Sequence, residues 1–148
     1  MQDKLDTGTK AVYFVFVGLW SAILVSQFLF LLIIYFAKPD IFDADSSSQP
    51  IDVVYILAAL AGIVLVGSFV VKKLLLSYAR ASKVSALIFV ASILGSSLCD
   101  AVSLFGLLSA FVANYRYFFV FFLAGICGTI IHFPSRSALV AASNTQEH

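Results

Sequence analysis

Charged side chains are scarce in this sequence of 148 residues. They make up 11% of it, whereas soluble globular domains carry roughly 25%. Hydrophobic residues supply 61% instead, above the roughly 45–50% of soluble domains. This balance excludes an ordinary soluble domain and is typical of an integral membrane protein. The expected surroundings are a lipid bilayer, and no nucleic-acid partner is predicted.

Residues for covalent or metal chemistry are equally few. The only two cysteines, Cys99 and Cys127, fall in apolar runs, where a thiol is most simply a small packing group. No metal-ligand spacing surrounds them. The sequence also lacks a nucleophile–base pair and a phosphate-binding glycine loop. We therefore expect no enzymatic activity, no cofactor and no metal.

What the sequence does have is long apolar runs. A spanning helix needs about 20 mostly apolar residues, and four runs qualify, the fourth barely. They cover residues about 11–37, 51–71, 84–113 and 117–133. The alternating strands of a transmembrane barrel are absent. The predicted fold is all-α and integral to the membrane, a single domain over residues 1–148 built as a bundle of four transmembrane helices.

The basic residues are divided unequally between the two ends of these helices. Two lie in the first and third connections, Lys38 and Arg116. The other seven lie in the N-terminal segment, the second connection and the tail: Lys4, Lys10, Lys72, Lys73, Arg80, Lys83 and Arg136. Because cytoplasmic loops carry the excess of Lys and Arg, both termini are predicted to be cytoplasmic.

Small residues repeat along the third predicted helix. The stripe they form consists of Ser85, Ser92, Cys99 and Gly106 at intervals of seven, with Ser96, Ser103 and Ala110 at alternate positions. Small residues let helices approach closely in lipid. The stripe therefore favours a helix-packing face, although small residues are also common in spanning helices generally.

Asp100 lies near the middle of that helix. An ionised aspartate at this depth costs about 2.5–3.5 kcal/mol, and desolvation favours its protonated form. Ser96 and Ser103 lie one turn to either side, and Gln27 of the first helix could join them if the two helices touch. Two interpretations stay open: a reversible proton or ion site, or a permanently protonated Asp100 bonded to a neighbouring helix. His132 is expected to be an interfacial side chain.

The stretch LCDAVSLFGLLSAF, residues 98–111, resembles the ion-binding helix of the proteolipid, or c, subunit of rotary ATP synthases. In that family a carboxylate is followed six residues later by glycine, as Asp100 is followed by Gly106 here. The resemblance implies that Asp100 binds a proton, with Ser96 and Ser103 beside it. The sequence departs from the family in that the preceding helix lacks its glycine run and the loop lacks its Arg-Gln-Pro signature. Sodium-binding members place polar ligands on both helices of the hairpin, whereas Gln27 lies outside the matching hairpin, so H⁺ is expected rather than Na⁺.

Residues 75–136 are also similar to a family of small bacterial four-helix membrane proteins. They share a basic second loop, the spacing from Asp100 to Gly106, and the sequence HFP at 132–134. This resemblance implies the bacterial inner membrane. Two functions are expected: a c-subunit-like homo-oligomer with a mid-membrane proton-binding carboxylate, or a non-catalytic accessory or scaffold subunit of a larger membrane complex.

Overall fold

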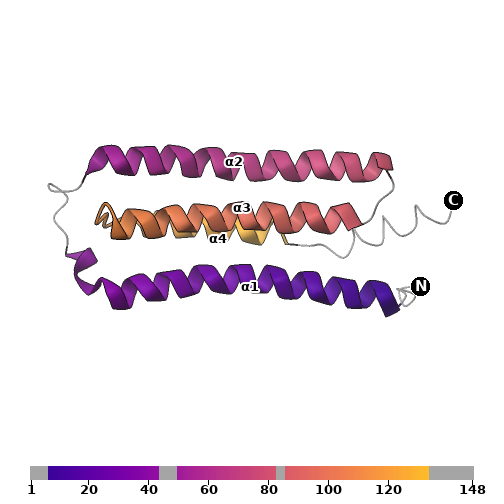
Figure 1. Cartoon of the computed structure of the whole chain (residues 1–148), viewed down its shortest axis with the longest axis horizontal. Coiled ribbons are helices and arrows are strands. Elements are labelled where there is room, and N and C mark those ends of the chain that lie inside the picture. Colours follow the sequence, from indigo (N-terminus) through magenta and orange to yellow (C-terminus); the bar gives the residue numbers. More distant parts are fainter. Residues whose placement is uncertain (1–6, 44–49, 83–85, 134–148) are drawn as a thin grey trace.

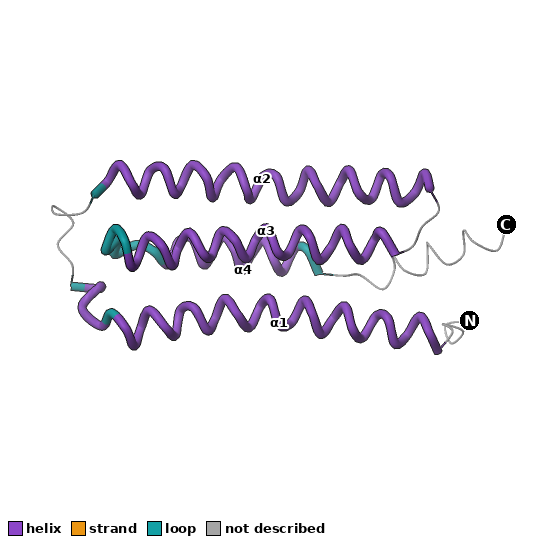
Figure 2. The backbone as a smooth tube through the Cα atoms, in the orientation of Figure 1, coloured by secondary structure: helices purple, strands orange, loops and turns teal. Residues whose placement is uncertain are grey.

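The computed structural model describes residues 7–43, 50–82 and 86–133, and these form helices and short connections (Figures 1 and 2). The elements are α1 (Thr7–Ala37), the short 3-10 helix η1 (Pro39–Phe42), α2 (Ile51–Ser82), α3 (Ala86–Phe111) and α4 (Phe119–Ile131). The predicted all-helical bundle with four main helices is confirmed.

Three of the helices have the length and composition of membrane spans. Their apolar segments are Tyr13–Ala37, Ile51–Tyr78 and Val90–Phe111. The fourth helix is shorter than its apolar run predicted, because the turn after α3 takes Tyr117 and Phe118. At 13 residues it extends for about 20 Å, less than the roughly 30 Å of a bilayer core.

Helix α3 is the centre of the bundle, and it packs against α1, α2 and α4. Figure 1 shows α1 and α2 on opposite sides of α3, with α4 behind it. Successive main helices run in opposite directions, and the N-terminal end of α1 therefore lies at the same end of the bundle as the start of α3. Of the three long helices, the bundle buries α3 most, and α3 also has the least hydrophobic apolar segment.

Glycines set the close contact between α3 and α4. A Cβ atom at Gly125 would lie 2.8 Å from the carbonyl oxygen of Cys99, and one at Gly128 would lie 2.6 Å from the Cys99 Sγ. On α3, a Cβ at Gly106 would lie 2.8 Å from the ring of Phe122. Since all three distances are below ordinary van der Waals contact, the two backbones approach as closely as they do only because these side chains are absent.

The small-residue stripe of α3 is enclosed within the chain. Its described members are all buried: Ser92, Ser96, Cys99, Ser103, Gly106 and Ala110. Ser85 lies outside the described residues. Because Cys99, Ser103 and Gly106 lie against α4, this part of the stripe faces a helix of the same chain.

Side chains from other helices contact the carbonyl groups in the C-terminal turn of α4. Trp20 of α1 donates from Nε1 to the Thr129 oxygen at 2.8 Å. Lys72 of α2 donates to the Ile131 oxygen at 3.3 Å. The His132 Nδ1 lies 2.7 Å from the Gly128 oxygen. The Gly128 and Thr129 carbonyls also accept the backbone N–H of His132, each at 3.1 Å. The side chains therefore add a second polar contact to these two carbonyls, and Lys72 supplies a donor to that of Ile131, one of the last carbonyls of the helix.

His132 is not the interfacial side chain that the sequence predicted. Its exposed fraction is 0%, and its ring lies on Gly95, where a Cβ atom would collide with it. Gly95 is five residues inside the apolar segment that begins at Val90, or about 8 Å along the helix. His132 is buried because α4 ends at Ile131 and the residue that follows it lies inside the bundle.

Lys38 satisfies the C-terminus of α3 at the opposite end of the bundle. Its Nζ donates to the carbonyl oxygens of Ala110 at 3.1 Å and Phe111 at 3.3 Å, and to Asn114 Oδ1 at 3.2 Å. A cation stabilises the negative end of the helix dipole. Asn114 has a positive φ of 47°, a conformation that asparagine adopts more readily than most residues, and it turns the chain toward α4.

The glycine contact predicts a large difference between two Gly→Ala variants. Gly125→Ala should lower the free energy of unfolding by roughly 1–3 kcal/mol, the usual cost of overpacking. Gly67→Ala is the matched control, because nothing lies within 4 Å of a Cβ there. Unfolding in mixed detergent micelles measures both. Equal stability of the two variants would contradict the close contact.

The indole hydrogen bond to Thr129 predicts a second stability difference. Trp20→Phe keeps an aromatic ring but removes the donor, and it should cost about 0.6–1.7 kcal/mol, the measured range for polar contacts between membrane helices. Tyr55→Phe, which removes a hydroxyl from an exposed residue of α2, is the control. The same unfolding measurement gives the stability of both variants. A Trp20→Phe variant as stable as the control would contradict the hydrogen bond from Trp20 to the Thr129 carbonyl.

Candidate functional site

Asp100 occupies the midpoint of the α3 apolar segment. It is ten residues from Val90 and eleven from Phe111, which is about 15 Å and 17 Å of helix. Its carboxyl is partly buried and faces α1, where Ser26 Oγ lies 3.1 Å from Asp100 Oδ1. The site thus places one carboxyl group between two helices at the depth where an ionised acid is most costly.

Ser26 has two acceptors for a single hydroxyl hydrogen. Its Oγ lies 2.7 Å from the carbonyl oxygen of Ile23 and 3.1 Å from Asp100 Oδ1. A hydroxyl carries one donor and two acceptor positions. If Ser26 donates to Ile23, the contact with Asp100 is a hydrogen bond only when the carboxyl is protonated and donates. If Ser26 turns, it donates to an ionised Asp100. The same geometry therefore accommodates both charge states.

Gln27 joins α1 to α4 beside this carboxyl. Its exposed fraction is 0%, and its Nε2 donates to Thr129 Oγ1 at 2.8 Å, while the Thr129 hydroxyl donates to the Gly125 oxygen at 2.9 Å. Gln27 directly follows Ser26, the residue of α1 that meets the Asp100 carboxyl. Its Oε1 is buried and accepts no hydrogen bond from the described residues, so the site contains an acceptor that lacks a donor.

The two serines predicted beside Asp100 make no hydrogen bond to its carboxyl. Ser96 and Ser103 are fully buried, and their hydroxyls bond to none of the described residues. Ser103 lies against Gly125 of α4. The structure therefore brings Asp100 together with Gln27, as predicted from the two deep polar residues, but it does not join either serine to the carboxyl.

The arrangement suits proton transfer more than any covalent reaction. Within the described part of the chain, no group of three or more His, Cys, Asp or Glu residues could hold a metal ion. Burial favours the neutral form of the Asp100 carboxyl, whereas hydrogen bonds from a hydroxyl or an amide favour its ionised form. The site therefore holds one carboxyl whose hydroxyl neighbour can bond either of its charge states.

Sequence reasoning missed three residues that build this site: Ser26, Thr129 and Trp20. Ser26 and Thr129 are small residues of apolar helices, and nothing in the sequence around them indicates a polar contact. A usable signal existed only for Trp20, which lies too deep in its helix for the interfacial positions that tryptophan prefers. A buried indole needs an acceptor for its N–H group, and here that acceptor is the Thr129 carbonyl.

Comparisons with known proteins give no family for the chain. No protein-family model matches it, and neither a curated protein nor a solved structure does. The function of the site must therefore be inferred from its own geometry.

Proposed function

We propose that the protein is a c-subunit-like membrane protein in which Asp100 reversibly binds a proton in the middle of the bilayer. The observation that carries the proposal is the pair of distances at Ser26, 2.7 Å to the Ile23 oxygen and 3.1 Å to Asp100 Oδ1. An acid serving only as structural glue between helices needs one fixed bonding pattern. This acid has a neighbour suited to both of its charge states.

The proposed cycle requires rotation of a hydroxyl group and no helix movement. In the protonated state Asp100 donates to Ser26, which donates to the Ile23 carbonyl. When the proton leaves, the Ser26 hydroxyl turns and donates to the carboxylate. Gln27 stays fixed through Thr129 and keeps its amide beside the carboxyl. The ion is H⁺ rather than Na⁺, because the hydroxyls of Ser96 and Ser103 add no ligand bonded to the carboxyl.

The proposal includes the setting in which the proton is exchanged. Both termini lie in the cytoplasm of a bacterial cell, and the chain is a multi-pass protein of the inner membrane that assembles as a homo-oligomer. Because α4 lies against the small-residue stripe of α3 at Cys99, Ser103 and Gly106, the contact between copies forms through another face. The three long apolar helices support the membrane setting.

A carboxylate reagent tests the proton site. Dicyclohexylcarbodiimide reacts with protonated carboxyl groups in apolar surroundings, so it should label the wild-type chain and lose that labelling as the pH rises. Asp100→Asn should abolish it. Asp52→Asn, at an exposed position in the first turn of α2, is the control and should leave it unchanged. Mass spectrometry of the modified chain measures the label.

Ser26→Ala makes this test specific for the proposed mechanism. Without the hydroxyl, the carboxyl loses the partner that serves its ionised state, so the variant should keep its label to a higher pH than the wild type. Folded wild-type protein that takes no label would contradict the proton site. A Ser26→Ala profile identical to that of the wild type would contradict the role of Ser26.

A second candidate function rests on Ser97. This serine is exposed on α3 near the middle of its apolar segment, and lipid chains offer its hydroxyl no hydrogen bond. A polar side chain on a partner helix would satisfy it. The protein would then be an accessory or scaffold subunit of a larger membrane complex, with Asp100 and Ser97 at the subunit contact.

Mass analysis of particles extracted in native lipid, without detergent, distinguishes the two functions. A closed homo-oligomer is expected from the first, since each copy then contributes one Asp100. A stoichiometric complex with foreign subunits is expected from the second and would contradict the first. A lone monomer would contradict both functions, because each of them requires a protein partner on the exposed face of α3.

A further inference from the structure

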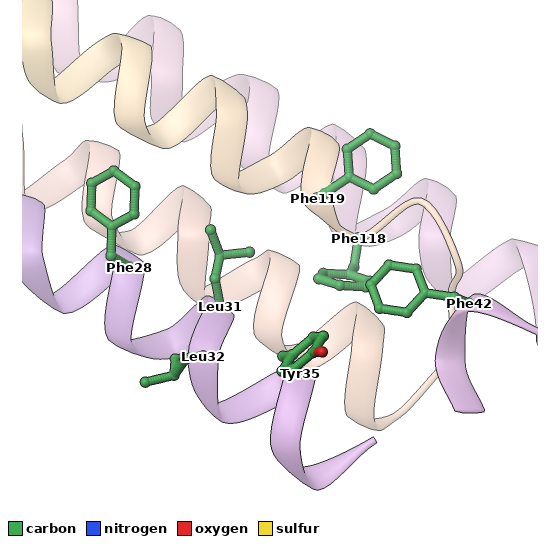
Figure 3. Close-up of a pocket in the computed structure, with 7 residues that line it drawn as sticks. All are labelled: Phe28, Leu31, Leu32, Tyr35, Phe42, Phe118 and Phe119. Atoms are coloured by element: carbon green, nitrogen blue, oxygen red, sulfur yellow. The ribbon is translucent and has the colours of Figure 1, made fainter. Parts of the chain in front are cut away.

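A groove runs between α1 and the start of α4, and Asp100 is not among the residues that line it. Its walls include Phe28 and Leu32 of α1 and Phe119 of α4 (Figure 3). Phe42 of η1 lies against Phe118 at one end, with ring centroids 5.9 Å apart. The volume of about 380 Å³ falls within the roughly 300–1,000 Å³ typical of small-molecule sites.

The groove is open along one side, and its lining is apolar except for one hydroxyl group. Tyr35 contributes that hydroxyl, which Figure 3 shows directed toward the Phe42 end. Tyr35 lies two residues from the end of the α1 apolar segment at Ala37, the level at which tyrosine meets lipid headgroups. Its hydroxyl makes no hydrogen bond to the described residues. The groove therefore combines a long apolar wall with a donor at the membrane surface.

Charges of both signs lie at the same end. Arg116, two residues before Phe118, is exposed, and its guanidinium lies 5.9 Å from the Tyr117 ring centroid. Asp40 is exposed in the 3-10 helix that carries Phe42. A guanidinium group binds phosphate well, and a carboxylate attracts an ammonium group. Together they complement a zwitterionic headgroup.

We propose that the groove binds one acyl chain of a phospholipid with a zwitterionic headgroup, from the leaflet at the Ala37 end of α1. The chain lies along Phe28, Leu32 and Phe119. The Tyr35 hydroxyl donates to an ester or phosphate oxygen, and Arg116 pairs with the phosphate. The headgroup amine faces Asp40. This lipid site is independent of Asp100 and would exist whether or not that carboxyl exchanges protons.

Native mass spectrometry of the full-length chain in mild detergent, titrated with dioleoylphosphatidylethanolamine, tests the proposal. The wild type should bind one lipid tightly. Leu32→Trp places an indole in the groove from an exposed position and should weaken binding about tenfold, or roughly 1.4 kcal/mol. Leu60→Trp, an equally exposed apolar residue of α2 away from the groove, is the control and should bind as the wild type does.

A second pair of substitutions tests the headgroup contacts. Tyr35→Phe and Arg116→Ala keep the apolar wall and should each weaken binding, whereas both should leave binding of dioleoylglycerol, which lacks the phosphate, closer to the wild-type level. Phe119→Trp should repeat the effect of Leu32→Trp from the opposite wall. Binding that is equal in Leu32→Trp, Phe119→Trp and Leu60→Trp would overturn the lipid site. So would a wild-type dimer that Leu32→Trp converts to a monomer, because a second copy would then occupy the groove.

Discussion

A carbonyl group in the apolar interior must find a donor, and this requirement governs how α4 is held. The helix ends about 8 Å inside the apolar segment of α3, at the level of Gly95. Trp20 from α1 and Lys72 from α2 donate to its last carbonyls, and the ring of His132 lies against another. Because the donors come from two different helices, capping the end of α4 also fixes α1 and α2 relative to each other. No hydrophobic contact would impose that position, since lipid is as apolar as the side chains themselves.

The position of the polar site follows from this capping. Thr129 accepts the indole hydrogen bond through its carbonyl and the Gln27 hydrogen bond through its side chain. Thr129, in the last turn of α4, therefore also holds the amide of Gln27. At the other end Lys38 caps α3 and bonds to Asn114, where the chain turns back into α4. Two lysines thus hold opposite ends of the α3–α4 pair, and the carboxyl group lies between them.

The helices can be predicted from the sequence, but the polar contacts between them cannot. Hydropathy predicts the three long apolar helices, because a long apolar run that satisfies its own backbone hydrogen bonds forms a helix. It does not predict that α2 continues to Ser82. The spacing of small residues indicates the buried face of α3 for a similar reason. Ser26 and Thr129 have no such pattern, because their roles depend on which faces of α1, α3 and α4 meet. The burial of His132 cannot be predicted from the sequence. A histidine two residues before a proline is equally compatible with the membrane–water interface and with a buried helix end.

The rigid and adjustable parts of the bundle lie on different sides of Asp100. Behind it, Gly106, Gly125 and Gly128 bring α3 and α4 so close that no Cβ atom fits between them, and a change in helix spacing there would leave voids or collisions. Toward α1, the carboxyl meets the hydroxyl of Ser26, which has the Ile23 carbonyl oxygen as a second acceptor. Rotation of one Ser26 bond changes which group donates. The α1 side of Asp100 therefore admits two hydrogen-bonding arrangements, while the packing on the α4 side admits one.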